Sequence, residues 1–212
     1  MDAGPDTSLL LVRHGHTAGN DGGMDAPMAG WADLPLSARG VAEAQKLAER
    51  LAREAEGAPL YASPLERAQR TAALIGEAIH SVVLLDDALR EIGCGEADGL
   101  PLAQVRSRFP EAWAGNLRHD DPGFRWPGGE SYEELRARSV DAATRIASGH
   151  PGGRVVVVTH AGVISQLVGW IRGVSPARWD LFRPRNGSIT ELVLRGGTRG
   201  RLPAAGLVRF DA

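Results

Sequence analysis

Short apolar runs alternate with longer segments of helical periodicity along most of the chain. Residues 8–12 and 155–158 are nearly continuous runs of leucine and valine, which predict buried strands. Residues 39–54 carry apolar side chains at spacings of three and four, which predicts an amphipathic helix. Further strands are expected at residues 60–62, 81–85, 188–194 and 207–210, and further helices at 63–80, 102–110, 131–148 and 162–171. This alternation is typical of an α/β fold with a mostly parallel sheet.

Three stretches follow neither pattern. Residues 87–101 form a glycine-rich segment, which we expect to be a loop. Residues 113–129 combine tryptophans with charged side chains, and we expect an irregular excursion from the main layer there. The Gly/Arg/Pro linker before residue 207 is expected to be a mobile hairpin.

Composition and charge exclude several classes of protein. The chain has 212 residues, with 24 Lys+Arg against 26 Asp+Glu and a formal charge of -2. This balance argues against a nucleic-acid or membrane-surface partner, since both favour a basic excess. No apolar run approaches the roughly 20 residues of a membrane helix, and no leader pattern opens the sequence, so we expect a cytoplasmic protein. The single cysteine, Cys94, can form neither an internal disulfide nor, by itself, a structural zinc site.

Candidate chemistry begins where two predicted strands end in histidine. Residues 8–12 run into Arg13, His14 and Gly15, and residues 155–158 run into Thr159 and His160. Ligands of open parallel sheets bind beyond the carboxyl ends of the strands. If these two strands are neighbours, His14 and His160 share one pocket.

Two further charged residues lie at element boundaries. Arg67 lies one turn into the helix expected to begin at Ser63, with Ser63 as N-cap and Glu66 at the capping-box position. The positive end of a helix dipole stabilises anions, so Arg67 is a candidate anion ligand. Glu91 lies in a turn after the third strand. Taken alone, either residue could be an ordinary surface side chain.

Taken together, these segments resemble the signatures of the histidine phosphatase superfamily, the phosphoglycerate-mutase-like proteins. LLLVRHGHTAGN resembles the opening signature, and GWADLPLSARG, SPLERAQRTA, LREIGCGEADG, PGGES and VVVVTHAGVI follow in the order of the family, over about residues 8 to 190. The resemblance implies a three-layer α/β sandwich whose mostly parallel central sheet is flanked by helices. It also implies a single catalytic domain, residues 1–212, with a loop or cap insertion at about 95–130, and neither metal nor cofactor.

The resemblance also implies a role for each candidate residue. His14 would attack phosphorus and form a phosphohistidine. Glu91 would protonate the leaving alkoxide and then activate water as a general base. Arg13, Arg67 and a cationic His160 would hold the phosphoryl oxygens. The expected substrate-binding residues are Gly15, Thr17, Asn20 and Ala161, with Asn20 as a neutral donor.

The expected function is that of a metal-independent phosphomonoesterase. Its partner would be a small phosphorylated metabolite such as a sugar phosphate, a phosphoglycerate derivative, phosphoserine or the nucleotide-loop phosphate of cobalamin synthesis. Residues 113–129 would set the specificity, through Trp113, Arg118, His119, Arg125 and Trp126. The oligomeric state stays open between monomer and homodimer.

Three alternatives remain open. A phosphoglycerate-mutase-type phosphoryl transfer would use the same residues, although only 69 positions (160 minus 91) separate Glu91 from His160, and such mutases carry a longer insertion there. A metallohydrolase would use His14 and His16 on a continuing strand, but Gly15 and the turn-forming residues 18–20 argue against this. The third alternative is a non-catalytic module that binds a phosphorylated ligand.

Overall fold

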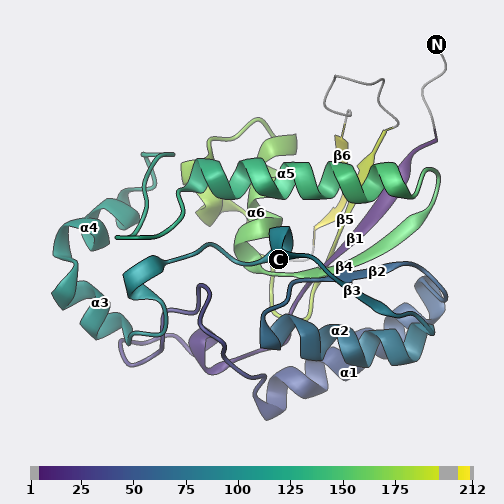
Figure 1. Ribbon diagram of the computed structural model, residues 1–212, viewed down its shortest axis with the longest axis horizontal. Coiled ribbons are helices and arrows are strands. Elements are labelled where there is room, and N and C mark those ends of the chain that lie inside the picture. Colours follow the sequence, from purple (N-terminus) through teal and green to yellow (C-terminus); the bar gives the residue numbers. More distant parts are fainter. Residues whose placement is uncertain (1–4, 196–204, 211–212) are drawn as a thin grey trace.

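A six-stranded sheet forms the centre of the molecule (Figure 1). The computed structural model describes residues 5–195 and 205–210. The strand order is β3-β2-β4-β1-β5-β6; the first four strands in this order are parallel, and β5 and β6 are antiparallel to their neighbours. The strands are β1 (Thr7–Arg13), β2 (Leu60–Ala62), β3 (Val83–Leu85), β4 (Arg154–Thr159), β5 (Ile189–Leu194) and β6 (Ala205–Phe210).

Helices cover both faces of this sheet (Figure 1). One face packs on α1 (Ala38–Glu54) and α2 (Glu66–Ile79), and the other on α5 (Tyr132–Gly149) and α6 (Ala161–Ile171). The expected three-layer α/β sandwich is therefore confirmed. No helix in the described part of the chain is long and apolar enough to cross a membrane.

The leucine and valine runs of β1 and β4 are explained by burial on both faces of the sheet. Successive side chains of a strand point to opposite faces of its sheet. Leu10 and Val156 join the core beneath α1 and α2, whereas Leu9 and Val155 join the core beneath α5 and α6. Because both faces of β1 and β4 are covered, neither strand alternates with polar residues.

A small cap projects from one end of the sandwich (Figure 1). It contains α3 (Leu102–Arg108) and α4 (Pro110–Arg118), and it has its own hydrophobic cluster around Val105 and Trp126. The expectation of irregular chain from residue 113 is wrong for its first part, because α4 continues to Arg118. Helix α4 begins at Pro110, which occupies the first helical position. The sequence shows no clear apolar face for this helix, because Leu117 is exposed and does not point into the core.

Two other boundaries differ from the expectation. Helix α2 begins at Glu66 with Leu65 at the N-cap, so Ser63 is not its cap and the expected capping box is absent from α2. The 87–101 segment contains two short 3-10 helices, η2 (Asp87–Leu89) and η3 (Gly95–Ala97). Most of the expected hairpin before residue 207 lies outside the described residues.

Two more 3-10 helices complete the elements of the described chain, η1 (Ala18–Asn20) and η4 (Pro176–Leu181).

Candidate active site

The two strand-end histidines lie side by side. Strands β1 and β4 pair in parallel with Arg13 opposite Thr159, so both strands end at the same level. The ring centroids of His14 and His160 are 5.0 Å apart, and both side chains are buried. The two strands are therefore neighbours and bring the two histidines together, which is the condition that the prediction of a shared pocket set.

The neighbouring backbone fixes the tautomer of His14. Its Nδ1 lies 2.7 Å from the carbonyl oxygen of Gly15, which can only accept, so Nδ1 carries the proton and Nε2 carries the lone pair. Burial lowers the pKa of His14 well below its usual range, and the nearby charges of Arg67 and Arg13 lower it further. At neutral pH the ring is therefore an uncharged imidazole with a nucleophilic nitrogen.

His160 is oriented by a serine that the sequence pattern assigned to another role. Its Nε2 is 2.7 Å from the hydroxyl oxygen of Ser63, and its buried Nδ1 has no hydrogen-bond partner among the described residues. Burial and then the charge of Arg67 lower the pKa of His160 well below its usual range. Desolvation thus favours the neutral ring in the absence of phosphate, whereas the expectation of a cationic His160 concerns the site with a phosphoryl group bound. A dianion placed among these groups would raise the pKa again.

Backbone carbonyls hold the two guanidinium groups of the site. Arg67 is fully buried and donates to the carbonyl oxygens of Ala32 and Gly30 at 2.8 and 2.7 Å. Arg13 donates to the carbonyl oxygen of Pro184 at 2.8 Å. Within the described residues, the buried Nε of each arginine has no partner. Such N–H groups are costly to leave unpaired, so they suit an anion bound between them.

Glu91 is the carboxylate with the largest electrostatic influence on both arginines. One carboxylate oxygen accepts from the backbone N–H of Ile92 at 2.9 Å, and the other accepts from that of Gly162 at 3.0 Å. Burial lowers the pKa of Arg13 and Arg67, and the charge of Glu91 is the main opposing influence on both. The first turn of α6 therefore holds the Glu91 carboxylate in a position from which its charge acts on both arginines.

Glycine is required where this carboxylate meets α6. A Cβ on Gly162 would lie 2.0 Å from Oε1 of Glu91. A side chain there would displace the carboxylate from its two backbone donors. Gly162 is thus a site residue that the sequence analysis did not single out, although it follows His160 by only two positions.

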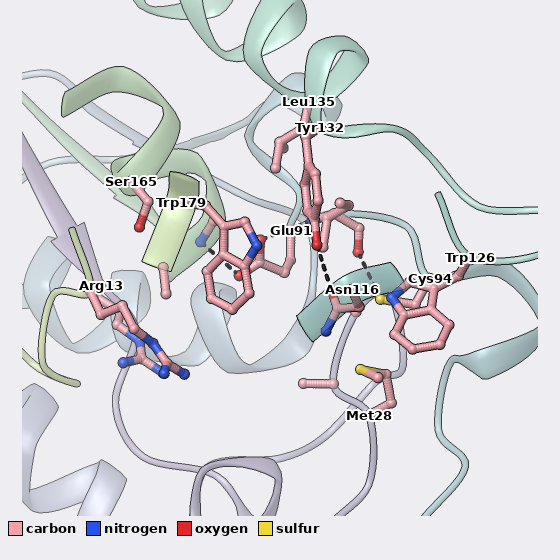
Figure 2. A pocket seen from close by; sticks show the side chains of 16 residues that line it. Arg13, Met28, Glu91, Cys94, Asn116, Trp126, Tyr132, Leu135, Ser165 and Trp179 are labelled. Atoms are coloured by element: carbon pink, nitrogen blue, oxygen red, sulfur yellow. Dashed lines mark hydrogen bonds between the residues drawn. The ribbon is translucent and has the colours of Figure 1, made fainter. Parts of the chain in front are cut away.

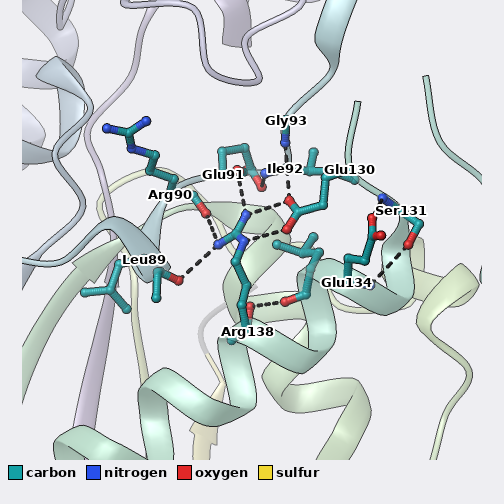
Figure 3. A network of polar contacts seen from close by, with 12 residues as sticks. Leu89, Arg90, Glu91, Ile92, Gly93, Glu130, Ser131, Glu134 and Arg138 are labelled. Carbon is teal, nitrogen blue, oxygen red and sulfur yellow. Dashed lines mark hydrogen bonds and ion pairs between the residues drawn. The ribbon is translucent and has the colours of Figure 1, made fainter. Parts of the chain in front are cut away.

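An arginine on α5 holds the backbone around Glu91 (Figure 3). Arg138 donates to the carbonyl oxygens of Ala88, Arg90 and Glu91 at 3.0, 2.7 and 2.8 Å. Its guanidinium is held in turn by the carboxylate of Glu130, at 2.6 and 2.7 Å. No local pattern signalled this pair, because a turn before the Ser131 cap of α5 explains the segment containing Glu130 equally well.

The loop after β1 is fixed by close backbone packing. A Cβ on Gly15 would lie 2.3 Å from the carbonyl oxygen of Gly40, at the start of α1. Oδ1 of Asn20 accepts from the backbone N–H of Thr17 and from Asn186, both at 3.0 Å. This arrangement leaves the amide NH₂ of Asn20 as a donor. Thr17 is fully buried and bonds to Asn20, so it orients that residue.

His16 belongs to a different set of contacts. Its Nε2 pairs with Asp21 at 3.1 Å, and its Nδ1 lies 3.0 Å from the hydroxyl of Ser37. Because β1 ends at Arg13, His14 and His16 do not share a strand face. The alternative of a two-histidine metal site therefore lacks the geometry on which it depended.

A cavity of about 230 Å³ opens beside Arg13 and Glu91 (Figure 2). Ala161 and Gly162 form part of its wall. Of the five residues expected to set specificity from residues 113–129, only Trp126 lines the cavity, joined by Asn116 of the same segment. The sequence analysis missed several other large side chains of the wall, among them Met28, Tyr132, Trp179 and Arg183.

Comparison with known proteins identifies the family. Residues 9–202 match the sequence profile of the histidine phosphatase superfamily (branch 1), and the chain belongs to this family. It is 37% identical over 164 residues to phosphoglycerate mutase-like protein 4 of Arabidopsis thaliana, covering 75% of this chain and 68% of that protein. It is 36% identical over 163 residues to a metal-independent phosphoserine phosphatase of Arabidopsis thaliana, covering 76% and 67%.

A solved structure extends the similarity to the whole fold. The native structure of a mycobacterial glucosyl-3-phosphoglycerate phosphatase superposes with a TM-score of 0.83 at 29% identity, covering 98% of this chain and 99% of that one. With the family and its relatives, this similarity makes the protein a phosphoric monoester hydrolase.

Replacing Gly162 with Ala should reduce activity without unfolding the protein. The new methyl group would move the Glu91 carboxylate, and a misplacement of about 1 Å at a reacting group costs on the order of 100-fold in rate. The rate on phenyl phosphate should fall by roughly that factor. The matched control is Gly149→Ala on α5, where a Cβ meets nothing within 4 Å. Equal activity in the two variants would show that Glu91 tolerates displacement.

The buried histidines should make stability depend on pH. Their pKa values are lowered in the folded protein, so below about pH 6.5 the unfolded chain binds more protons and gains stability. The free energy of unfolding should therefore fall as the pH drops from 7 to 5.5, by up to about 1.4 kcal/mol per pH unit for each histidine. Urea titrations of wild type and His160→Gln at both pH values measure this dependence.

The substitution should flatten the pH dependence, because one of the two buried rings is gone. His80→Asn is the control, since His80 is exposed and lies in a left-handed conformation that asparagine tolerates. An unchanged slope in His160→Gln would contradict the assigned cause.

Proposed function

We propose that this phosphatase hydrolyses a small phosphorylated metabolite through a phosphohistidine on His14, using side chains and no metal. The observation that carries the proposal is the hydrogen bond between Nδ1 of the buried His14 and the Gly15 carbonyl, which leaves Nε2 free to attack, next to two guanidinium groups held by backbone carbonyls. Fixed cationic donors favour a phosphoryl group because charge spreads over its oxygens as the bond to the leaving group breaks.

Four side chains would hold the phosphoryl oxygens. Arg13 and Arg67 offer buried N–H groups that no residue in the described chain accepts, and His160 offers its Nδ1. Asn20 adds its amide NH₂, because its oxygen is already occupied. The carbonyl contacts of both arginines hold these donors in place before the substrate arrives, so little reorganisation accompanies the reaction.

The reaction would proceed in two displacements. In the first, Nε2 of His14 forms a bond to phosphorus, the bond from phosphorus to the leaving oxygen breaks, and Glu91 gives a proton to that oxygen. In the second, Glu91 takes a proton from water, the water oxygen bonds to phosphorus, and the bond to Nε2 breaks. Phosphate leaves, and Glu91 returns to its protonated starting form.

The substitution His14→Ala should abolish both turnover and covalent labelling. Incubation of the wild type with a ³²P-labelled monoester, followed by rapid quenching at alkaline pH, should trap label on the protein. The variant should retain none and should release no phosphate above background. Retained label on His14→Ala would place the nucleophile elsewhere. Conversion of 3-phosphoglycerate to its isomer without phosphate release would favour the mutase alternative.

The acid role of Glu91 predicts a dependence on the leaving group. Glu91→Gln cannot protonate an alkoxide, so turnover of a poor leaving group such as glycerol 3-phosphate should fall by roughly 100-fold or more. Turnover of p-nitrophenyl phosphate should fall much less, because nitrophenolate leaves without a proton. Single-turnover rates on both substrates measure the difference. An equal loss on both would assign Glu91 a purely electrostatic role.

A further inference from the structure

The position of Glu91 tells where the leaving group must lie. If Glu91 protonates the leaving oxygen, as the proposed function requires, the alcohol part of the substrate extends from the phosphoryl site past this carboxylate. The cavity beside Arg13 and Glu91 occupies that side (Figure 2). Its walls therefore describe the alcohol that this enzyme accepts.

These walls are mostly apolar and aromatic. Trp126, Tyr132 and Trp179 line the cavity together with Met28 (Figure 2). The rings support one another, since Phe124 stacks on Tyr132 with centroids 5.5 Å apart and meets Trp126 edge-on at 5.5 Å. The hydroxyl of Tyr132 donates to Asn116 and is thereby held in place. A rigid aromatic wall of this kind favours a substrate with a flat apolar face.

One full positive charge lies on this wall apart from the phosphoryl site. The Arg183 guanidinium lies over the ring of Trp179, 5.2 Å from its centroid, and Arg183 also lines the cavity. Its charge is close enough to Arg13 to lower the pKa of Arg13. Across the described residues no carboxylate pairs with Arg183, whereas Arg39, Arg90 and Arg138 each have one.

The cation–π contact with Trp179 leaves the N–H groups of Arg183 without a hydrogen-bond acceptor among the described residues. The N–H groups of a guanidinium match the two oxygens of a carboxylate. The phosphoryl group itself is already surrounded by Arg13, Arg67 and the two histidines. The positive charge of Arg183 would therefore have no partner in a substrate whose only negative charge is its phosphate.

We propose that Arg183 is a specificity residue that binds a carboxylate on the leaving group. The preferred substrates are then phosphate monoesters whose alcohol carries both a flat apolar face, packed against Trp179 and Tyr132, and an acidic group at the cavity mouth. Arg183 is not among the residues that the sequence analysis expected to set specificity. It lies in the segment between η4 and β5 and not within residues 113–129.

Arg185 offers a matched control two positions further on. It is exposed like Arg183, and both line a second, polar groove together with Arg39 and Arg50. Of these two arginines, Arg183 lines the aromatic cavity as well and Arg185 does not. A general attraction of the basic surface for anions would therefore involve both arginines, whereas recognition of the leaving group would involve Arg183 alone.

The experiment compares two esters that differ by one carboxylate, phenyl phosphate and 3-carboxyphenyl phosphate. Wild type should prefer the carboxylated ester by roughly tenfold in kcat/KM, as expected for one charge-assisted hydrogen-bonded pair. Arg183→Gln should reduce this preference to about one while leaving phenyl phosphate within about twofold of wild type. Arg185→Gln should keep the wild-type preference. Calorimetric affinities of both esters in the His14→Ala background give the same preference without turnover.

Any other result contradicts either the assignment of Arg183 or the proposed function. A wild type without preference, or an Arg185→Gln variant that loses it equally, would refute leaving-group recognition by Arg183. Equal loss on both esters in Arg183→Gln would assign that residue to the phosphoryl site. Absence of turnover combined with a preserved preference in affinity would refute the proposed function and leave the assignment of Arg183 intact.

Discussion

Burial of positive charge at one end of the sheet is the constraint that orders the whole site. Arg13 and Arg67 lie against two buried imidazoles, and Glu91 is the carboxylate that most strongly offsets them. Burial keeps the histidines neutral, and the fixed charges of the two guanidinium groups, which do not give up protons under physiological conditions, act in the same direction. The neutral state of His14 is what makes a nucleophile of its Nε2, so the same electrostatic conflict that costs stability also creates reactivity.

The fold meets this conflict with backbone groups that cannot move away. Carbonyl oxygens from the loop before α1 and from the segment before β5 hold the arginines, and backbone N–H groups hold the carboxylate. Arg138 and Glu130 form a further layer, which ties α5 to the loop that carries Glu91. The helical layers thus contribute to the geometry of the site as well as to the core.

The parts of this arrangement visible in the sequence are those with local signals. Continuous runs of leucine and valine predicted β1 and β4, and two histidines at the ends of these strands predicted a shared pocket. Ser63 was interpreted as a helix cap because serine before proline and glutamate satisfies that pattern, and only tertiary packing brings it to His160. Arg138 and Arg183 had no local signal, since their partners come from distant segments.

Cys94 lines the aromatic cavity and has a consequence for the durability of the protein. Burial raises the pKa of its thiol well above the usual range, and the neighbouring carboxylates of Asp98 and Glu91 act in the same direction. Oxidants and alkylating reagents attack the thiolate form, and this sulfur stays protonated. Cys94 should therefore resist the oxidants that inactivate enzymes whose catalysis depends on a thiolate.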